Sequence, residues 1–165
     1  MNIKALEKGS SAATSSPKAA VKFLLDTLYV YQQGDDGALG YLGFVLSKND
    51  LVADENAPSK FMPSVSTLQS VKRLKDPRYA NSILALMGGT WQKDYKDAKP
   101  DAYTLPVTKE DDPGNGHRVF LKSGGRDNPF PVTLKQSGSG AWKVTEGLGT
   151  ICMDVRKTKT AAEDI

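Results

Sequence analysis

The stretch VFLKSGGRDNPFPVTLKQSGSGAWKV, residues 119–144, decides the architecture expected for this chain. It contains three short runs rich in β-branched and aromatic residues, separated by SGGRDNP and SGSG. Glycine, proline, asparagine and aspartate in such separators are typical of turns. In the middle run, the apolar residues Val132 and Leu134 alternate with polar neighbours, as in a strand with one covered face. The stretch therefore predicts two linked antiparallel hairpins.

Flanking segments have the same two-residue period. The segments at 103–107 (YTLPV), 117–122 (HRVFLK) and 150–156 (TICMDVR) are short and rich in β-branched or aromatic residues. They bring the expected number of strands to about five. In the last segment, the alternation places Ile151 on the apolar face of the sheet and Cys152 on the opposite face.

The chain before the strands has the period of helices. Ser16 and Pro17 predict a helix start, because the serine hydroxyl can accept an unpaired N–H and proline lacks the N–H that would go unpaired. Further helix starts are expected at Asp35, at Ser64 or Ser66, and at Asp76. Helices followed by a meander of strands indicate an α+β fold. We expect three to four N-terminal helices packed on a twisted antiparallel sheet of about five strands, with a cone-like shape.

The composition indicates one domain with short ends. Residues 1–15 lack an apolar period and are expected to form a flexible arm. Residues 16–157 are the size of a single α+β domain, and residues 158–165 are expected to be a tail. Within the domain, residues 49–63 and 90–103 have the composition of loops.

Charge and apolar content argue against several classes of partner. The formal net charge is +3, and the 22 basic residues are interleaved with 19 acidic ones, whereas nucleic-acid-binding domains gather basic charge on one face. We therefore expect no nucleic-acid partner. The chain has no apolar run of about 18 residues and no signal-peptide pattern near its start. We expect no membrane partner and a cytoplasmic location.

The residue inventory argues against metal and cofactor chemistry. Cys152 is the only cysteine and His117 the only histidine, so cysteine-rich and paired-histidine metal sites are not expected. The Ser-Gly-Gly at 123–125 follows a strand, as in a phosphate-binding loop, but no helix start follows it. We predict no metal, no cofactor and no catalytic residues. The chain is expected not to be an enzyme, although paired carboxylates or His117 with Cys152 leave that question open.

Six residues are the candidates for contact with a ligand or partner. They lie in the turn after Ser-Gly-Gly, in the 90–103 loop and beside a glycine-rich turn: Arg126, Asp127, Asn128, Trp91, Tyr95 and His117. The structural alternative for Asp127 and Asn128 is an Asx-type turn, with the preceding glycines at positive φ. The functional alternative is an arginine at the mouth of a pocket that meets an anionic partner. For Trp91 and Tyr95, the alternative is an anchor on a short helical turn.

The same stretch resembles an uncharacterised family of bacterial domains of unknown function. The shared pattern is Ser-Gly-Gly with an aspartate two positions on, then Pro-x-Pro-Val-Thr-Leu, a Trp-bearing strand and a final Asp-Val-Arg. Here it is carried by Ser123, Gly124, Gly125, Asp127, Pro129, Pro131, Val132, Thr133, Leu134, Trp142, Asp154, Val155 and Arg156. The resemblance spans about residues 17–156, and Phe130 departs from the basic residue expected there. The last strands are also similar to those of cone-shaped domains like nuclear transport factor 2.

The resemblance implies no established activity and no catalytic residues. We expect a non-enzymatic binding or assembly module of a bacterial system, which contacts a protein partner or further copies of itself. The alternative is a pocket for a small molecule between the sheet and the helices.

Overall fold

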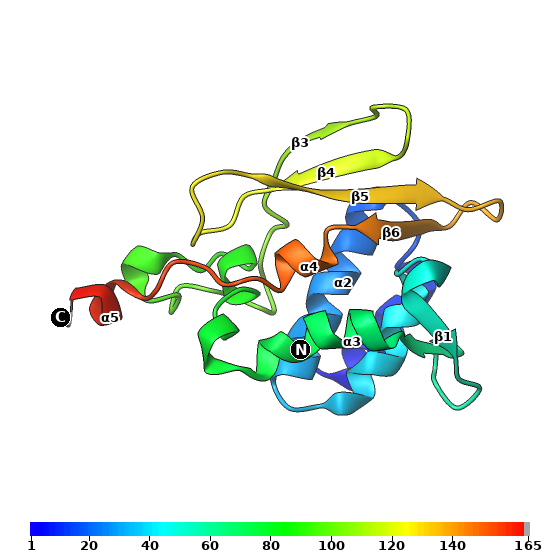
Figure 1. Ribbon diagram of the computed structural model, residues 1–165, viewed down its shortest axis with the longest axis horizontal. Coiled ribbons are helices and arrows are strands. Elements are labelled where there is room, and N and C mark those ends of the chain that lie inside the picture. Colours follow the sequence, from blue (N-terminus) through cyan, green and yellow to red (C-terminus); the bar gives the residue numbers. More distant parts are fainter. Residues whose placement is uncertain (164–165) are drawn as a thin grey trace.

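The computed structural model describes residues 1–163 and has an α+β fold, as predicted. Figure 1 shows the larger sheet along the top of the molecule, with most of the helices beneath it and the smaller sheet beside those helices. The α-helices are α1 (Ile3–Gly9), α2 (Pro17–Gln32), α3 (Val65–Lys72), α4 (Leu148–Ile151) and α5 (Lys159–Glu163). The strands are β1 (Leu51–Ala53), β2 (Phe61–Pro63), β3 (Val107–Asp111), β4 (His117–Leu121), β5 (Phe130–Gln136) and β6 (Trp142–Glu146). Short 3-10 helices connect them: η1 (Ser10–Ala12), η2 (Asp36–Phe44), η3 (Lys48–Asp50), η4 (Arg73–Lys75), η5 (Pro77–Tyr79), η6 (Leu84–Leu86) and η7 (Trp91–Lys93).

Helix α2 is the central element of the helical layer. The Ser16 hydroxyl accepts a hydrogen bond from the Ala19 N–H at 3.1 Å, which confirms the predicted Ser-Pro start. The helix ends before Gly34, whose φ of +110° suits a glycine. Its apolar stripe, including Leu24 and Leu28, is fully buried. Burial of this stripe against η2, β4 and β6 stabilises this layer.

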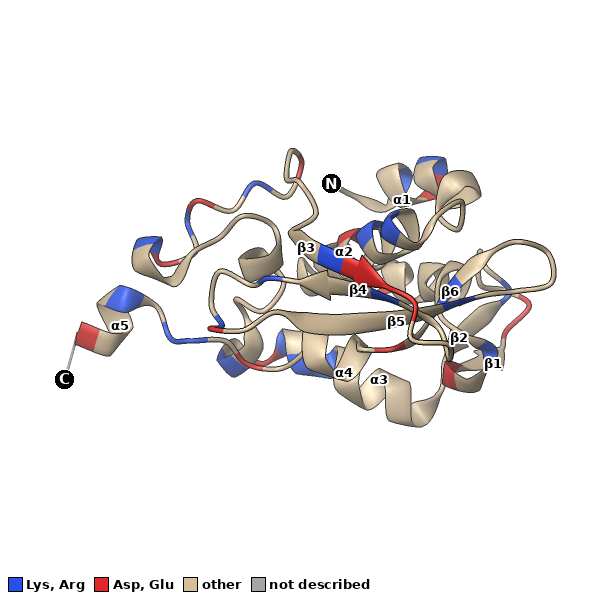
Figure 2. Cartoon of the chain, turned by 90° about the horizontal axis from the view of Figure 1, so that it is seen from above, with Lys and Arg blue, Asp and Glu red and all other residues tan. Residues whose placement is uncertain are grey.

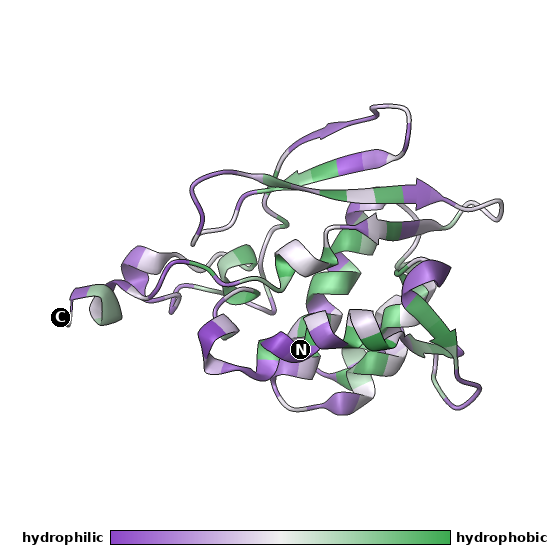
Figure 3. Cartoon of the chain, viewed as in Figure 1, coloured by the Kyte–Doolittle hydropathy of each residue, from purple (hydrophilic) through white to green (hydrophobic). Residues whose placement is uncertain are grey.

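The main sheet has the strand order β3-β4-β5-β6 and is antiparallel throughout. Val119 pairs with Val132, and Leu134 pairs with Val144. These four side chains are buried, whereas Lys135 is exposed. The predicted alternation over residues 131–135 is therefore confirmed at Val132, Leu134 and Lys135, but it is wrong at Thr133, which is also buried. Together with α2, the central strands carry many of the hydrophobic residues of the chain (Figure 3).

Three segments differ from the strand predictions. The strand expected at 103–107 begins only at Val107, where β3 starts, and residues 103–106 have no regular secondary structure. The expected strand at 150–156 is absent: residues 148–151 form α4, and the chain continues without regular structure to Thr158. The main sheet consequently has four strands rather than about five. The expected loop at 49–63 contains the small hairpin β1–β2. Gly43 lets η2 pack against this hairpin, because a Cβ there would lie 2.2 Å from the Ser59 hydroxyl oxygen.

Both expected chain ends are more ordered than their composition indicates. Instead of a flexible arm, residues 1–15 contain α1, whose Leu6 is only 1% exposed. Asn2 caps this helix by accepting a hydrogen bond from the Ala5 N–H at 3.1 Å. At the other end, α5 begins at Lys159. Of the expected tail at 158–165, residues 164–165 lie outside the described residues.

The outer edge of β6 is hydrogen-bonded to segments from the helical layer. The Val144 N–H donates to the Val45 carbonyl at 2.7 Å, and the Ser47 N–H donates to the Val144 carbonyl at 3.0 Å. The Trp142 N–H donates to the Thr14 carbonyl at 3.1 Å. These bonds fix the sheet to the helical layer and satisfy backbone groups that an edge strand would otherwise leave free.

The charged residues are distributed along the whole chain. Figure 2 shows Lys and Arg interspersed with Asp and Glu on loops and strands, as the mixed-charge sequence predicts. Over residues 1–163, no helix is both long and apolar enough to cross a membrane.

Candidate functional site

The Ser-Gly-Gly turn lies where two other segments cross the end of β4. The Gly124 N–H donates to the Ala85 carbonyl at 2.8 Å, and the Gly124 carbonyl accepts from the Trp91 N–H at 3.2 Å. The Gly125 carbonyl accepts from the Arg156 N–H at 2.9 Å. The turn is therefore a backbone crossing point, and its amides and carbonyls are not arranged around a phosphate.

Close approach of backbones explains both glycines. A Cβ on Gly124 would lie 1.9 Å from the Gly89 carbonyl oxygen, and a Cβ on Gly125 would lie 2.7 Å from Cβ of Val155. Neither glycine has a positive φ. The expectation of positive φ at these positions is therefore wrong, because the requirement is space for a neighbouring chain segment and not an unusual conformation.

Arg126 connects this turn to the end of α4. Its Nη2 donates to the Thr150 carbonyl at 2.6 Å and to the Met153 carbonyl at 3.2 Å. The guanidinium also lies 5.0 Å from the centre of the Phe130 ring. Burial lowers the pKa of Arg126 from its ordinary value. The Thr150 carbonyl in the last turn of α4 also accepts from the Met153 N–H at 3.2 Å. Arg126 is therefore a second donor there and acts as a side-chain cap for the end of α4.

Trp91, Tyr95 and Asp127 converge on Arg156. Asp127 Oδ1 accepts from Arg156 Nη2 at 2.7 Å, and the Arg156 guanidinium lies 4.9 Å from the centre of the Trp91 ring. The Tyr95 hydroxyl donates to the Arg156 carbonyl. Tyr95 is only 2% exposed. Asp127 therefore forms an ion pair instead of the expected Asx turn, and Asn128, the next residue, is exposed.

We call this arrangement the Arg156 slot, formed by Trp91, Asp94, Tyr95, Gly125 and Asp127. Four of the six predicted contact residues thus come together around it: Trp91, Tyr95, Arg126 and Asp127. The predicted helical turn through Trp91 and Tyr95 is wrong, because η7 ends at Lys93 and both Asp94 and Tyr95 have positive φ.

An open cleft of about 390 Å³ lies beside the Arg156 slot. It is lined by three cationic side chains, but each already has a partner within the fold. The Lys122 ammonium donates to the carbonyls of Arg126 and Asp127. Arg126 and Arg156 hold the partners described above. These interactions of the three cationic side chains therefore stabilise this corner of the domain.

His117 lies at the opposite end of β4 from the Arg156 slot. Its Nδ1 is 2.8 Å from Asp112 Oδ1, and its Nε2 is 2.8 Å from Glu110 Oε1. The hydrogen bond to Glu110 and that to Asp112 raise the pKa of His117 above its ordinary value of 6.5. The hydrogen bond from His117 also lowers the pKa of Glu110. The ring therefore fastens the β3–β4 turn as an imidazolium, with the Trp142 ring edge-on at 5.8 Å.

Through this ion pair, the free energy of unfolding is expected to be lower at a pH well above 6.5, the ordinary pKa of histidine, than at a pH below it. A histidine with a raised folded-state pKa stabilises the fold below its unfolded pKa, and the contribution is lost as the pH rises through the folded pKa. The expected loss is on the order of 1 kcal/mol, the size of a charge-assisted hydrogen bond. Urea unfolding of the wild type and of His117→Gln at both pH values measures it. An equal pH dependence in the two proteins would rule out His117 as its source.

Cys152 is a core residue. It follows α4, is fully buried, and therefore does not lie on the exposed face where the strand prediction placed it. Burial raises the pKa of its thiol to about 12. A thiol with so little thiolate at neutral pH is a poor nucleophile. His117 contacts Glu110, Asp112 and Trp142, so the structure does not support a His117–Cys152 pair.

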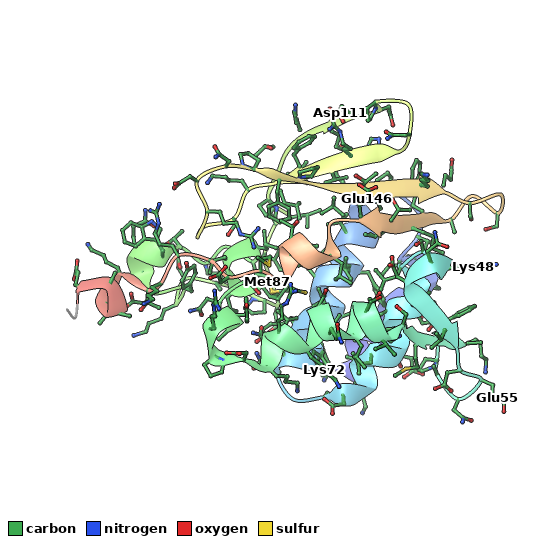
Figure 4. The ribbon with its side chains drawn as sticks, viewed as in Figure 1. Lys48, Glu55, Lys72, Met87, Asp111 and Glu146 are labelled. Carbon is green, nitrogen blue, oxygen red and sulfur yellow. The ribbon has the colours of Figure 1, made fainter. Side chains whose placement is uncertain are left out.

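A groove that the sequence did not indicate lies between the β5–β6 end of the main sheet and the β1–β2 hairpin. We call it the β6 groove; its volume is about 510 Å³. Its lining residues come from the end of η2, η3, the β1–β2 hairpin and strands β5 and β6: Gly43, Leu46, Ser47, Lys48, Asn49, Asp50, Leu51, Phe61, Lys135, Gln136, Ser137, Lys143, Thr145 and Glu146. In Figure 4, Lys48 lies on the helical side and Glu146 on the sheet side. A smaller cleft of about 290 Å³ adjoins it over α3 and shares Asp50, Thr145 and Glu146 with it.

The β6 groove combines an apolar surface with charged groups. Leu51 and Phe61 supply partly exposed apolar side chains. The Lys143 ammonium donates to the Phe44 carbonyl at 2.6 Å, and burial lowers the pKa of this amine. In the sequence, Lys143 alternates with Trp142 and Val144 like an ordinary solvent-facing residue. No local pattern identifies the groove, because it forms between segments about 90 residues apart.

Over residues 1–163, no group of three or more His, Cys, Asp or Glu residues is placed to hold a metal ion.

Comparison with known proteins identifies a family without a described activity. No curated protein and no solved structure matches the chain. The shape similar to nuclear transport factor 2 therefore stays a prediction. The family model described as "Domain of unknown function (DUF6935)" matches residues 1–159. The chain therefore belongs to this family of domains of unknown function.

Proposed function

We propose that the domain is a non-enzymatic binding module that holds an extended segment of a partner protein in the β6 groove. The segment would carry acidic side chains next to an apolar one. The observation that carries the proposal is the coexistence, in one groove, of the partly exposed apolar residues Leu51 and Phe61 with three lysines. The partner would belong to a bacterial system, as the family resemblance implies.

Apolar surface in the groove supports affinity. Binding grooves are typically concave and mainly apolar, with a few polar groups that orient the ligand. Leu51 and Phe61 lie on the two strands of the β1–β2 hairpin and are only partly buried. An apolar side chain of the ligand would bury this remaining surface, which contributes about 25 cal/mol per Å² before the costs of association.

Charge in the groove supports a preference for acidic segments. The cationic side chains are Lys48, Lys135 and Lys143, and the carboxylates are Asp50 and Glu146. Asp50 is 3.3 Å from the Ser47 hydroxyl oxygen, within hydrogen-bond distance. Complementary charge mainly raises the association rate and the specificity of a complex.

The side chains of the groove give no support to catalysis. Its lining includes lysines, carboxylates, a glutamine and hydroxyls, but no histidine and no cysteine. The one amine with a lowered pKa, that of Lys143, already donates to a backbone carbonyl. A ligand held in the groove would therefore be bound without being transformed.

Selection from a displayed library of random peptides tests this proposal. We expect the selected peptides to share acidic residues beside an apolar one. Their affinity should fall about tenfold or more, equivalent to about 1.4 kcal/mol, on Lys48→Glu and on Lys135→Glu. Both lysines are exposed, so the fold should tolerate these changes. Lys72→Glu, an exposed residue of α3 outside the groove lining (Figure 4), is the matched control and should not change affinity.

Failure to select any peptide, or equal losses on the control variant, would contradict the proposal. The volume of about 510 Å³ also falls in the range of about 300–1,000 Å³ that is usual for small-molecule sites. A small apolar acid in the same groove is therefore the second candidate. A thermal-shift screen of aliphatic and aromatic carboxylates, repeated on Lys48→Glu, distinguishes it from a peptide ligand.

A further inference from the structure

The segment that follows α4 packs lightly against the body of the domain. Residues 154–158 have no regular secondary structure. They lie beside an open cleft of about 560 Å³ that is bounded across from them by Pro77, Arg78 and Asn81. Arg156 also borders the cleft of about 390 Å³ on the other side. A segment flanked by two clefts can leave its position without opening the hydrophobic core.

Specific contacts nevertheless fix this segment in the Arg156 slot. The Arg156 N–H donates to the Gly125 carbonyl at 2.9 Å, and its guanidinium lies between Asp127 and Trp91. Further along, the Thr160 N–H donates to Asp94 Oδ1 at 2.9 Å, and the Thr160 hydroxyl donates to Asp94 Oδ2. Main-chain hydrogen bonds combined with pockets for individual side chains are the usual mode of peptide recognition.

The slot is formed by residues outside the segment. Asp94 and Tyr95 have φ of +54° and +61°, a conformation that costs a non-glycine residue about 1 kcal/mol or more. The Tyr95 N–H donates to the Thr90 carbonyl at 2.8 Å, and the Trp91 N–H donates to Gly124, so the loop is held without help from the segment. In this conformation, the Asp94 carboxylate and the Tyr95 hydroxyl both bond to the segment.

We infer that the Arg156 slot also accepts the 154–160 segment of a second copy of this chain, so that two copies exchange segments reciprocally. The occupant is defined by the interactions above: an arginine between a carboxylate and an indole, and a threonine four residues later on a second carboxylate. Exchange of an identical element costs little, because every interaction that breaks within one copy forms again with the other copy. This inference concerns a surface separate from the β6 groove and does not depend on the proposed function.

Exchange requires a hinge between α4 and the segment. Met153 is 43% exposed but its carbonyl is bonded to Arg126, so the hinge lies at the next residue, the exposed Asp154. Asp154 pairs only at 3.5 Å with the exposed Arg78, and such surface pairs contribute about 0–1 kcal/mol. The segment within one copy has a millimolar effective concentration at its own slot, so monomers dominate in dilute solution and exchanged dimers form at high concentration.

A charge exchange between two full-length variants tests this inference. In Asp127→Arg, the slot presents an arginine to the arginine of its own segment, so the two charges repel. In Arg156→Asp, the segment presents an aspartate to the aspartate of its own slot, and the charges again repel. Each variant alone should therefore have an open slot and sediment as a monomer. In a 1:1 mixture, each segment meets an opposite charge only in the other copy, so we expect heterodimers in sedimentation velocity. The double variant Asp127→Arg/Arg156→Asp restores the pair within one chain and should be monomeric.

A mixture that stays monomeric while circular dichroism shows both variants folded would overturn the inference. If either variant is unfolded, binding of a labelled peptide tests the exchange of segments instead. The peptide comprises residues 153–163 and is added to full-length Arg156→Ala. We expect it to bind this variant about tenfold or more tightly than the wild type, whose own segment competes. A peptide with alanine in place of its arginine should not bind. Absence of peptide binding to folded Arg156→Ala would equally overturn the inference.

Discussion

Gly124→Ala is expected to destabilise the domain by about 3 kcal/mol or more, because overpacking against a rigid backbone cannot relax. The added Cβ would lie 1.9 Å from the Gly89 carbonyl oxygen and 3.1 Å from Cα of Thr90. Relief of this clash requires separation of two backbone segments that are also joined by hydrogen bonds from Gly124 to Ala85 and from Trp91 to Gly124. Chemical denaturation with urea measures the loss.

The matched control for this change is Gly138→Ala. Gly138 has no positive φ, and a Cβ there would meet no atom within 4 Å. We expect a change within about 0.5 kcal/mol of wild type. If Gly124→Ala were equally well tolerated, the backbone crossing at the Ser-Gly-Gly turn would not exist as described.

Arg126→Ala is expected to cost about 2 kcal/mol, since hydrogen bonds to charged groups contribute about 1.5–3 kcal/mol when they are removed. The substitution leaves the carbonyls of Thr150 and Met153 without this donor and removes the interaction with the Phe130 ring. From sequence alone, a turn arginine would be expected to have almost no effect on stability. Urea unfolding of the variant therefore distinguishes a cap on α4 from a free surface arginine.

Asn128→Ala, two residues away in the same turn, is the control for this effect. Asn128 is exposed, and we expect its substitution to change the free energy of unfolding by less than about 0.5 kcal/mol. A loss below that value for Arg126→Ala as well would show that the guanidinium does not cap α4.

The parts of the fold predicted correctly are those with strong local signals. The Ser16-Pro17 start and the long apolar stripe define α2, and the run of β-branched and aromatic residues between two glycine-rich turns defines β5. In both elements, local propensity and burial point to the same structure, so tertiary context changes nothing.

The final predicted strand failed because its pattern fits two periods. Ile151, Met153 and Val155 alternate as in a strand, but Leu148, Ile151 and Cys152 also have the spacing of a helix face. Gly147, at φ +115°, turns the chain at the end of β6 and allows α4 to begin. The buried positions are Ile151 and Cys152, whereas Met153 is exposed. Packing between elements, which a single sequence does not reveal, decided between the two periods.

The sequence indicated which candidate residues lie near one another better than it indicated what each of them does. Trp91, Tyr95, Arg126 and Asp127 were expected to contact a ligand or partner, and the structure brings them together. The residue that unites three of them, Arg156, lies 29 positions from Asp127 and 61 from Tyr95. Such contacts between distant segments have no local signature. The β6 groove was missed for the same reason, because Lys48 and Lys143 meet only after the sheet has docked on the helical layer.

The hydrogen bonds along the outer edge of β6 determine how the sheet can grow. Chains that associate edge to edge need an unpaired, flat, apolar edge strand as a template. At β6, that edge is occupied by the backbone of Thr14, Val45 and Ser47. The opposite edge, β3, has the sequence VTKED, and charged side chains at an edge discourage further strands. The domain thereby protects both margins of its sheet against uncontrolled polymerisation, using docked backbone at one margin and charge at the other.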